Sequence, residues 1–490
     1  MRTAVDSVSE TPSTRLRLAY MGVLVGLIAI GYGGVVSAFF VADDFNYLNI
    51  ALPAQTFAKA TGIEDGWVFF RPLTGISFWV NALLFGKNPS SYHLVGLLFH
   101  GINAFLVARL TWQLFANRAG AAIGGMCFAV FPVHPEALTW ISARADVLCA
   151  TGTLLCVSGF LNFLRAENRT RPLIETLFGF VWALAAKDSA MVMPIVLLLV
   201  LGCSRDQQSP GRRRQTLYGF GGIVLLFVAY LIVRFSVLGG FGGHPGEEGS
   251  RHLQIDLSKA TRFAVDAVRC MFMPGTTTIA PLTSLVLILA LGGMMIRHAS
   301  PARFTRLTWP MLAIFFLLLA PVANIMVIDF ETAQQTRFLY TPSAFACTAL
   351  GVLVGTTAAA HNSRLLYGVG LLLVLGYTVN VCLENRRWRR AGDQVESILQ
   401  QLEEITKKRH YSEVFIHGLP DSVEGASVFR NGFDTAIKWF VDEDLVFKPR
   451  GKLSRSDWDK FSAMRRSKPD FNPDLLLVRW DPVAQRLVLP

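Results

Sequence analysis

The chain has 490 residues, of which 52% are hydrophobic and only 17% are charged, and its mean hydropathy is +0.41. This composition excludes an ordinary soluble globular protein and indicates a chain that crosses a membrane several times. In a soluble protein the net charge of +11 would suggest a nucleic-acid partner. Here arginine clusters that face anionic lipid headgroups explain the charge, and we expect membrane lipids and no nucleic acid as partners.

Apolar stretches with the length of a membrane-spanning helix recur between Leu18 and Leu383. A porin-like barrel is excluded, because its strands would alternate apolar and polar residues over segments of about ten. The sequence therefore predicts an all-α polytopic membrane domain with about eleven crossings. The predicted spans are Leu18–Val41, Tyr92–Leu114, Ala119–Val133, Val147–Leu164, Leu173–Ala185, Ala190–Cys203, Leu217–Val233, Ile279–Ile296, Leu307–Val327, Phe338–Leu353 and Leu365–Leu383.

Arginine clusters follow alternate spans, and lysine and arginine prefer the cytoplasmic side of a membrane. The orientation that fits these clusters gives a cytoplasmic tail (1–17), a membrane domain (18–383) and outer loops at 42–91, 134–146, 234–278 and 328–337. We expect the protein in the cytoplasmic (inner) membrane, with these loops facing the periplasm or the cell exterior.

Two adjacent carboxylates, Asp43 and Asp44, follow the first span. A charged side chain at the centre of a bilayer costs about 2.5 to 3.5 kcal/mol, so the pair is expected at the water-exposed rim. A single aspartate there would be read as the start of a solvated loop. Two in a row, with further charged residues at later outer turns, favour a functional site.

Charged and polar side chains recur at the other outer turns. The candidates are Arg71, His134, Glu136, Arg144, Asp146, Lys187, Asp188, Arg337 and Tyr340. Arg71 precedes an apolar segment at helical spacing that is expected to lie along the membrane interface. The basic residues Arg144, Lys187 and Arg337 would hold an anionic phosphate, because the planar fork of a guanidinium group matches the oxygens of a phosphate. The simpler alternative is that these charges pair with one another.

His134 and Glu136 lack a third ligand at metal-binding spacing. We therefore expect no required cofactor, with a divalent metal as an unsupported alternative.

Four segments of the chain resemble a known family. They are RPLTGISFWVNALLFGKNPSSYHLVGLLFHGINAFLVARL (71–110), FPVHPEALTWISARADVL, AAKDSAMVMPIVLLL and RFLYTPSA. In this order they resemble the membrane domain of the transmembrane TPR-containing protein O-mannosyltransferases and their bacterial relatives. These enzymes belong to the GT-C superfamily of polyprenyl-phosphate-sugar-dependent glycosyltransferases. The resemblance covers Asp43 to Leu383, and it implies a multi-helix GT-C-like fold whose first outer loop carries an acidic motif.

The acidic motif of the family is matched by Asp43 and Asp44, one of which would act as general base on an acceptor hydroxyl. The resemblance implies a polyprenyl-phosphate-linked sugar donor, a protein, lipid or glycan acceptor, and inverting transfer outside the cytoplasm. Arg144, Lys187 and Arg337 are assigned to the donor phosphate.

Two alternatives stay open. A transporter or flippase of lipid-linked saccharide commonly shows paired repeats or broken helices, which the sequence does not display. An O-antigen-type glycan ligase or polymerase would present similar basic residues to an outer-leaflet phosphate.

Residues 384–490 are predicted to form a small soluble α/β domain in the periplasm. Its predicted elements are helices at Gln394–Ile405 and Phe433–Phe440 and strands at Ser412–Gly418, Leu475–Trp480 and Arg486–Leu489. The chain departs here from the eukaryotic members, since no repeat of about 34 residues is present. The run FIHGLPDSVEGASVFRNGFDTA resembles the tails of bacterial relatives.

Overall fold

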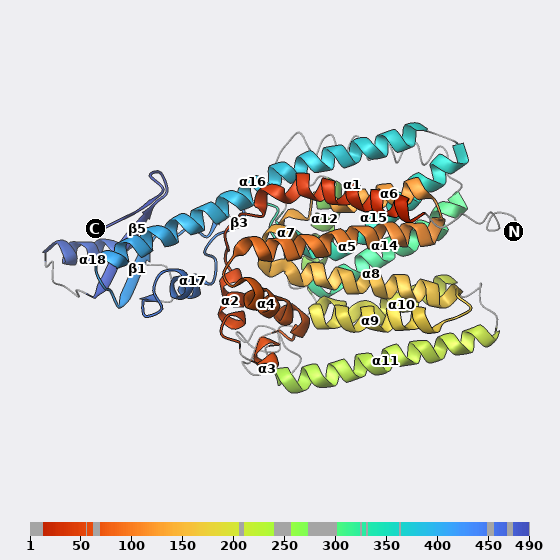
Figure 1. Cartoon of the computed structure of the whole chain (residues 1–490), viewed down its shortest axis with the longest axis horizontal. Coiled ribbons are helices and arrows are strands. Elements are labelled where there is room, and N and C mark those ends of the chain that lie inside the picture. The colour runs from red at the N-terminus through yellow and green to blue at the C-terminus, as the bar shows by residue number, and fades with distance from the viewer. Residues whose placement is uncertain are drawn as a thin grey trace.

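The computed structural model describes residues 13–54, 56–61, 69–204, 210–239, 256–272, 301–323, 326–329, 332–361, 364–447, 455–467 and 474–489. The predicted span Ile279–Ile296 and most of the predicted outer loop at 234–278 lie outside these residues. The described chain forms a bundle of helices that is joined at one end to a small α/β domain (Figure 1).

The bundle is built from eleven described α-helices. They are α1 (Thr14–Tyr32), α5 (Pro89–Phe115), α6 (Arg118–Ala129), α8 (Arg144–Arg165), α9 (Thr170–Ala186), α10 (Met193–Ser204), α11 (Pro210–Leu238), α12 (Leu257–Phe272), α14 (Pro301–Ala323), α15 (Tyr340–His361) and α16 (Arg364–Lys408). Every predicted span apart from Ile279–Ile296 contains one of these helices. The prediction of a helical, multi-span membrane protein is therefore confirmed.

Six helical segments in the described part of the chain are long and apolar enough to cross a membrane. They are Thr14–Val35, Pro89–Phe115, Ile141–Arg165, Gly211–Leu238, Thr336–Thr357 and Arg364–Lys408. Other predicted spans are shorter helices, such as α6 with 12 residues and α9 with 17, where a perpendicular crossing takes about 20. The described residues thus contain six long apolar spans together with shorter apolar helices, and about eleven crossings remain a prediction.

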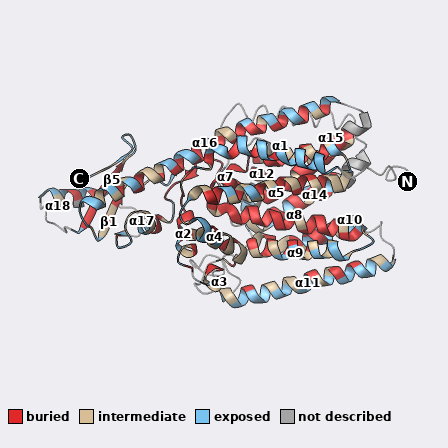
Figure 2. Cartoon of the chain, in the orientation of Figure 1, coloured by how far each residue is buried: buried red, intermediate tan, exposed pale blue. Residues whose placement is uncertain are grey.

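Helix α8 lies at the centre of the bundle and is buried along most of its length (Figure 2). It packs closely on α9 through glycines, because a Cβ atom on Gly152 would lie 2.4 Å from the backbone nitrogen of Ala183. Small residues at such positions allow membrane helices to approach each other. On the periphery, α11 exposes Leu225 (71%) and Ile232 (62%), as expected for a helix that faces lipid.

Short elements cap the bundle at the end that faces the α/β domain. They are η1 (Gly33–Val35), α2 (Asp44–Ala51), α3 (Phe57–Ala60), α4 (Pro72–Phe85), α7 (Pro135–Thr139), η2 (Ile141–Ala143), η3 (Asp188–Val192) and η6 (Thr336–Leu339). The segment after Arg71 is a helix, as predicted. With 14 residues α4 is about 21 Å long, which is shorter than a hydrocarbon core of about 30 Å. We call this end of the bundle the capped end.

Helix α16 runs for 45 residues from the bundle into the C-terminal domain (Figure 1). The predicted domain boundary at residue 384 falls inside it, so the last membrane helix and the helix predicted at 394–405 are continuous. The charges that mark this boundary in the sequence include Glu384 and Arg387, which form an ion pair at 3.0 Å and are 2% and 5% exposed.

The C-terminal domain contains a four-stranded sheet of order β4-β1-β5-β6. β1 (Glu413–His417) pairs in parallel with β4 (Val446–Phe447) and β5 (Leu475–Asp481), and β6 (Arg486–Val488) pairs antiparallel with β5. The remaining elements are the hairpin β2 (Ser422–Val423) and β3 (Ala426–Ser427) and the helices α17 (Phe433–Phe440) and α18 (Arg455–Ser467). The predicted small α/β region is confirmed.

This domain packs directly on the first outer loop. The Phe45 ring lies 6.4 Å from that of Phe429 and 5.8 Å from that of Phe440, and the Ala42 amide donates to the Val428 carbonyl at 2.8 Å. Gly432 approaches the loop so closely that a Cβ atom would lie 2.6 Å from the Ala42 oxygen. The first outer loop and the C-terminal domain therefore share one hydrophobic core.

Candidate active site

The two adjacent carboxylates play different structural parts at the start of α2. Asp44 is 1% exposed and accepts hydrogen bonds from the Val41 amide (3.0 Å), the Ser142 amide (2.7 Å) and the Ser142 hydroxyl (2.5 Å). Burial raises the pKa of Asp44 to about 7, against the hydrogen bond from the Ser142 side chain, which lowers it. Asp44 therefore ties the first outer loop to η2, 98 residues later in the chain.

Asp43 caps the same helix but remains partly exposed. Its Oδ1 atom accepts hydrogen bonds from the side-chain amides of Asn431 (2.9 Å) and Asn46 (3.4 Å). Its Oδ2 atom accepts none from any residue that the structure describes. Of the two carboxylates, Asp43 is the one that a ligand can reach.

Two guanidinium groups converge on one carboxylate near this pair. Arg71 Nε lies 3.2 Å from Asp188 Oδ2, and Arg234 pairs with Asp188 Oδ1. The Tyr47 side chain is hydrogen-bonded to Arg71 and also lies within electrostatic reach of Asp43. Arg71 and Arg234 thus bring two positive charges to one carboxylate, and Tyr47 connects Arg71 with the surroundings of Asp43.

Arg234 is not among the site residues predicted from the sequence. The signal that could have found it is its place as the first charged residue after the apolar run of α11, which ends at Val233.

Asp146 and Lys187 form a buried ion pair within electrostatic reach of Arg71. Their charged atoms are 2.5 Å apart, and the side chains are 8% and 7% exposed. Burial lowers the pKa of Lys187, while Asp146 opposes this change. Arg71 and Arg337 lower it too, so both guanidinium groups lie within electrostatic reach of Lys187.

Glu136 holds η6 in place through hydrogen bonds with Thr336 and Arg337. It is 3% exposed and accepts hydrogen bonds from Arg337 Nη1 (2.7 Å), the Arg337 amide (2.9 Å) and Thr336 Oγ1 (3.2 Å). The Arg337 guanidinium lies 4.6 Å from the centroid of the Trp140 ring. The alternative that these charges pair with one another is thus realised for Glu136 with Arg337, for Asp146 with Lys187 and for Arg71 with Asp188.

We call this set the outer-end cluster. It consists of Asp43, Asp44, Tyr47, Arg71, Glu136, Asp146, Lys187, Asp188, Arg234 and Arg337.

Three predicted site residues take other positions. Arg144 is 2% exposed, donates to the carbonyls of Tyr92 (2.9 Å) and Ser77 (3.2 Å), and lies over the Phe78 ring at 4.4 Å. It therefore joins α4 to α5, and its guanidinium is engaged by backbone oxygens in place of a ligand.

His134 and Tyr340 are fully buried inside the bundle. His134 Nε2 is hydrogen-bonded to Ser343 Oγ (2.7 Å), and the Tyr340 hydroxyl to His100 Nδ1 (2.7 Å). These contacts connect α7 and α5 with α15.

Among the described residues, no three His, Cys, Asp or Glu side chains gather in a way that could hold a metal ion. The expectation that no cofactor is required stays a prediction.

No family model matches the chain. Protein O-mannosyl-transferase TMTC3 of Homo sapiens is 28% identical over 173 residues, which are 33% of this chain and 18% of that protein. TMTC1 of Mus musculus is 38% identical over 179 residues, which are 33% of this chain and 19% of that protein. A protein O-mannosyl-transferase of Caenorhabditis elegans is 24% identical over 341 residues, covering 66% of this chain and 46% of that protein. The matches thus span less than half the length of these relatives.

The fold is shared with ArnT from Cupriavidus metallidurans. The structure of ArnT bound to undecaprenyl phosphate superposes with a TM-score of 0.55 at 12% identity, over 96% of this chain and 94% of ArnT. The structure of ArnT in the apo state gives 0.54 at 11% identity. The chain is therefore a multi-pass integral membrane protein with the GT-C fold of ArnT, and it is homologous over part of its length to the TMTC protein O-mannosyltransferases.

Proposed function

We propose that this protein is a membrane glycosyltransferase that moves a sugar from a polyprenyl-phosphate donor to an acceptor hydroxyl. The relatives it matches are named protein O-mannosyl-transferases, and ArnT, which shares its fold, binds undecaprenyl phosphate. The observation behind the proposal is the outer-end cluster, where a reachable carboxylate, Asp43, is linked through Tyr47 to Arg71, and Arg71 and Arg234 both pair with Asp188. The carboxylate can act on a neutral hydroxyl while the guanidinium groups hold a phosphate.

Arg71 and Arg234 are the residues that we assign to the donor phosphate. Guanidinium groups bind phosphate oxygens in bidentate fashion, and both of these pair with the same carboxylate, Asp188. Negative charge grows on the phosphate as its bond to the sugar breaks, and fixed donors aimed at that charge stabilise the transition state. Lys187, which is paired with Asp146, adds a third positive charge within electrostatic reach of Arg71.

Asp43 is the residue that we assign as general base. It takes the proton of the acceptor hydroxyl, the hydroxyl oxygen attacks the anomeric carbon, and the bond from that carbon to the phosphate oxygen breaks. The products are the glycosylated acceptor and the polyprenyl phosphate, and this single displacement inverts the anomeric configuration. Asp44 is unsuited to the role, because three donors already occupy its carboxylate.

The acceptor and the orientation follow from the same arrangement. Asn431 of the C-terminal domain bonds to Asp43, so an acceptor must approach between this domain and the capped end of the bundle. The acceptor is a protein, lipid or glycan hydroxyl. Arginines gather at the other end of the bundle, at Arg15, Arg17 and 212–214, and this supports an outer-end cluster that faces the extracytoplasmic side of the cytoplasmic membrane.

The test is transfer of radiolabelled sugar from a polyprenyl-phosphate donor by the purified full-length protein. We expect Asp43→Asn to lose about a hundredfold or more in rate, the range for removal of a general base. Asp434→Asn is the matched control, because Asp434 is exposed on α17 and lies outside the cluster. Unchanged transfer by Asp43→Asn would remove this carboxylate from the mechanism.

The same preparation discriminates the competing functions. Movement of labelled donor across proteoliposomes without cleavage of the sugar–phosphate bond would identify a transporter or flippase. Transfer of a whole glycan from a pyrophosphate carrier would identify a ligase or polymerase.

A further inference from the structure

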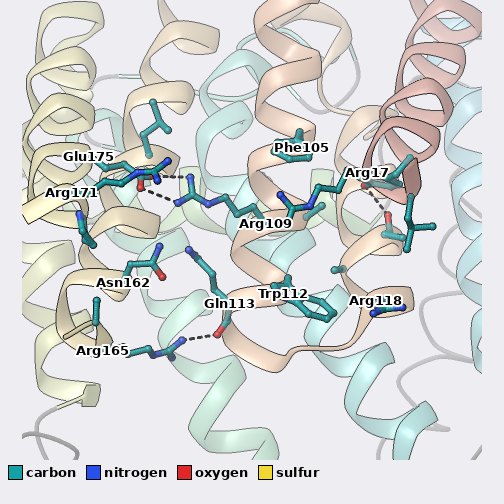
Figure 3. A pocket seen from close by; sticks show the side chains of 18 of the residues that line it. Arg17, Phe105, Arg109, Trp112, Gln113, Arg118, Asn162, Arg165, Arg171 and Glu175 are labelled. Atoms are coloured by element: carbon teal, nitrogen blue, oxygen red, sulfur yellow. Dashed lines mark hydrogen bonds and ion pairs between the residues drawn. The ribbon is translucent and has the colours of Figure 1, made fainter. Parts of the chain in front are cut away.

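A cavity of about 1380 Å³ opens at the end of the bundle opposite the capped end (Figure 3). It lies between the first turns of α1 and α9 and the last turns of α5 and α8. Arg144 begins α8 beside the outer-end cluster, whereas Arg165 ends α8 at this cavity, and the rise of an α-helix separates them by about 31 Å. The cavity is therefore distinct from the candidate active site.

The lining of the cavity is strongly basic. Five arginines line it, and Glu175 is its only acidic lining residue in the described chain, so the lining carries five positive charges against one negative. The arginines are Arg17, Arg109, Arg118, Arg165 and Arg171. Such an excess at the edge of an apolar bundle attracts an anion.

Of the five arginines, Arg109 and Arg165 are bound by neighbouring helices, whereas Arg17 and Arg171 face the cavity without an ionic partner among the described residues. Arg109 bonds to both oxygens of Glu175 at 2.5 and 2.9 Å, and Arg165 donates to the Gln113 carbonyl at 2.6 Å (Figure 3). Arg17 and Arg171 are exposed and form no ion pair with any described residue. They lie on α1 and α9, at the two sides of the opening (Figure 3).

The remaining walls are apolar and aromatic. Phe105 and Trp112 come from α5, and Ile174 and Phe178 from α9, where they are 62% and 54% exposed. Tryptophan is enriched at the level of lipid headgroups, so Trp112 marks the depth at which headgroup and acyl chains meet. A ligand that fits this cavity has an anionic head and a hydrocarbon tail.

We propose that the cavity binds an anionic phospholipid of the surrounding membrane, with its phosphodiester between Arg17 and Arg171 and its acyl chains along Phe105 and Phe178. Basic pockets between transmembrane helices on the cytoplasmic side bind anionic headgroups in this way. The Arg109–Glu175 pair joins α5 to α9 and keeps the two walls of the cavity at a fixed distance.

The test is binding of phosphatidylglycerol to the purified full-length protein in detergent, measured by native mass spectrometry. The double variant Arg17→Gln/Arg171→Gln removes the two unpaired charges, and Arg15→Gln/Arg213→Gln removes two exposed charges at the same end but outside the cavity. We expect the first to bind about fivefold more weakly for each charge removed, and the second to bind as the wild type does. Arg17→Lys/Arg171→Lys should retain most of the binding.

Two further measurements distinguish an anionic phospholipid from other phosphate-containing ligands. Phosphatidylcholine should bind weakly and equally to all variants, and inorganic phosphate should not displace phosphatidylglycerol. Equal weakening in the two double variants would overturn the proposal, because net charge alone would then explain the binding. Displacement by inorganic phosphate would overturn it too, by identifying a simple anion site.

Discussion

Replacement of Asp44 by asparagine should remove a pH dependence of the protein's stability. The carboxylate is buried with a pKa of about 7, whereas the ordinary value of about 3.8 applies in the unfolded chain. Between these two values the native state holds a proton that the unfolded state has released. The free energy of unfolding therefore falls as the pH rises through this window, from about 4 to about 7.

The size of the effect follows from the shift. A difference of about three pH units, at about 1.4 kcal/mol per unit, corresponds to a loss of about 4 kcal/mol across the window. Asparagine does not titrate, so Asp44→Asn should lack this slope. Its amide group would also leave one of the donors from Val41 or Ser142 without an acceptor, at a pH-independent cost of about 1 to 3 kcal/mol.

The assay is the apparent melting temperature of the full-length protein in nanodiscs, measured by tryptophan fluorescence at pH values across the window. Wild type should be more stable than Asp44→Asn at the acid end of the window, and the sign of this difference should reverse as the pH rises to its upper end. Ser142→Ala removes a hydrogen bond that lowers the pKa of Asp44, so its window should extend to higher pH. Parallel pH profiles for wild type and Asp44→Asn would refute the reasoning.

Three further predictions concern the surroundings of Asp43. Lys187→Met should destabilise the protein by about 3 to 5 kcal/mol in thermal unfolding, because it leaves Asp146 buried without a partner. The double variant Lys187→Met/Asp146→Asn should regain most of this loss. Arg234→Gln should lower kcat as well as raise the KM for the donor, whereas Arg213→Gln on the same helix should do neither. Gly432→Ala should slow transfer while the bundle stays folded. The new Cβ atom would lie 2.6 Å from the Ala42 oxygen, next to Asp43 in the chain, and the φ of Gly432 is +76°. Equal rates for this variant and wild type would show that the C-terminal domain does not position Asp43.

Hydropathy predicted the membrane helices well, because a span such as α5 or α11 carries its signal in about 20 consecutive residues. The strands β1 and β5 were also predictable, from short runs rich in β-branched and large apolar residues. The end of α16 was not, since Glu384 and Arg387 read as the end of a span although they neutralise each other in a buried ion pair. The two residues are only three positions apart, but local sequence does not record that the tertiary fold buries both of them.

In the candidate site, too, the sequence predicts which residues take part but not what their tertiary contacts make of them. The sequence brought Asp43 and Asp44 forward as a pair, and their positions in the chain are equivalent. What separates them is Ser142, which reaches Asp44 across 98 residues, and Asn431, which reaches Asp43 across 388. Likewise Arg144 looked like a phosphate ligand, but the carbonyls of Tyr92 and Ser77 occupy its guanidinium. Roles that depend on tertiary partners cannot be assigned from one sequence without the fold.

The most direct measurement is a structure of the full-length protein in nanodiscs with a polyprenyl-phosphate sugar bound. We expect the donor phosphate within hydrogen-bond reach, about 3 Å, of Arg71 or Arg234, with the Asp43 carboxylate on the side of the anomeric carbon away from the phosphate. A donor phosphate bound at the opposite end of the bundle, beside Arg17 and Arg171, or at the capped end but out of reach of Asp43, would contradict this expectation.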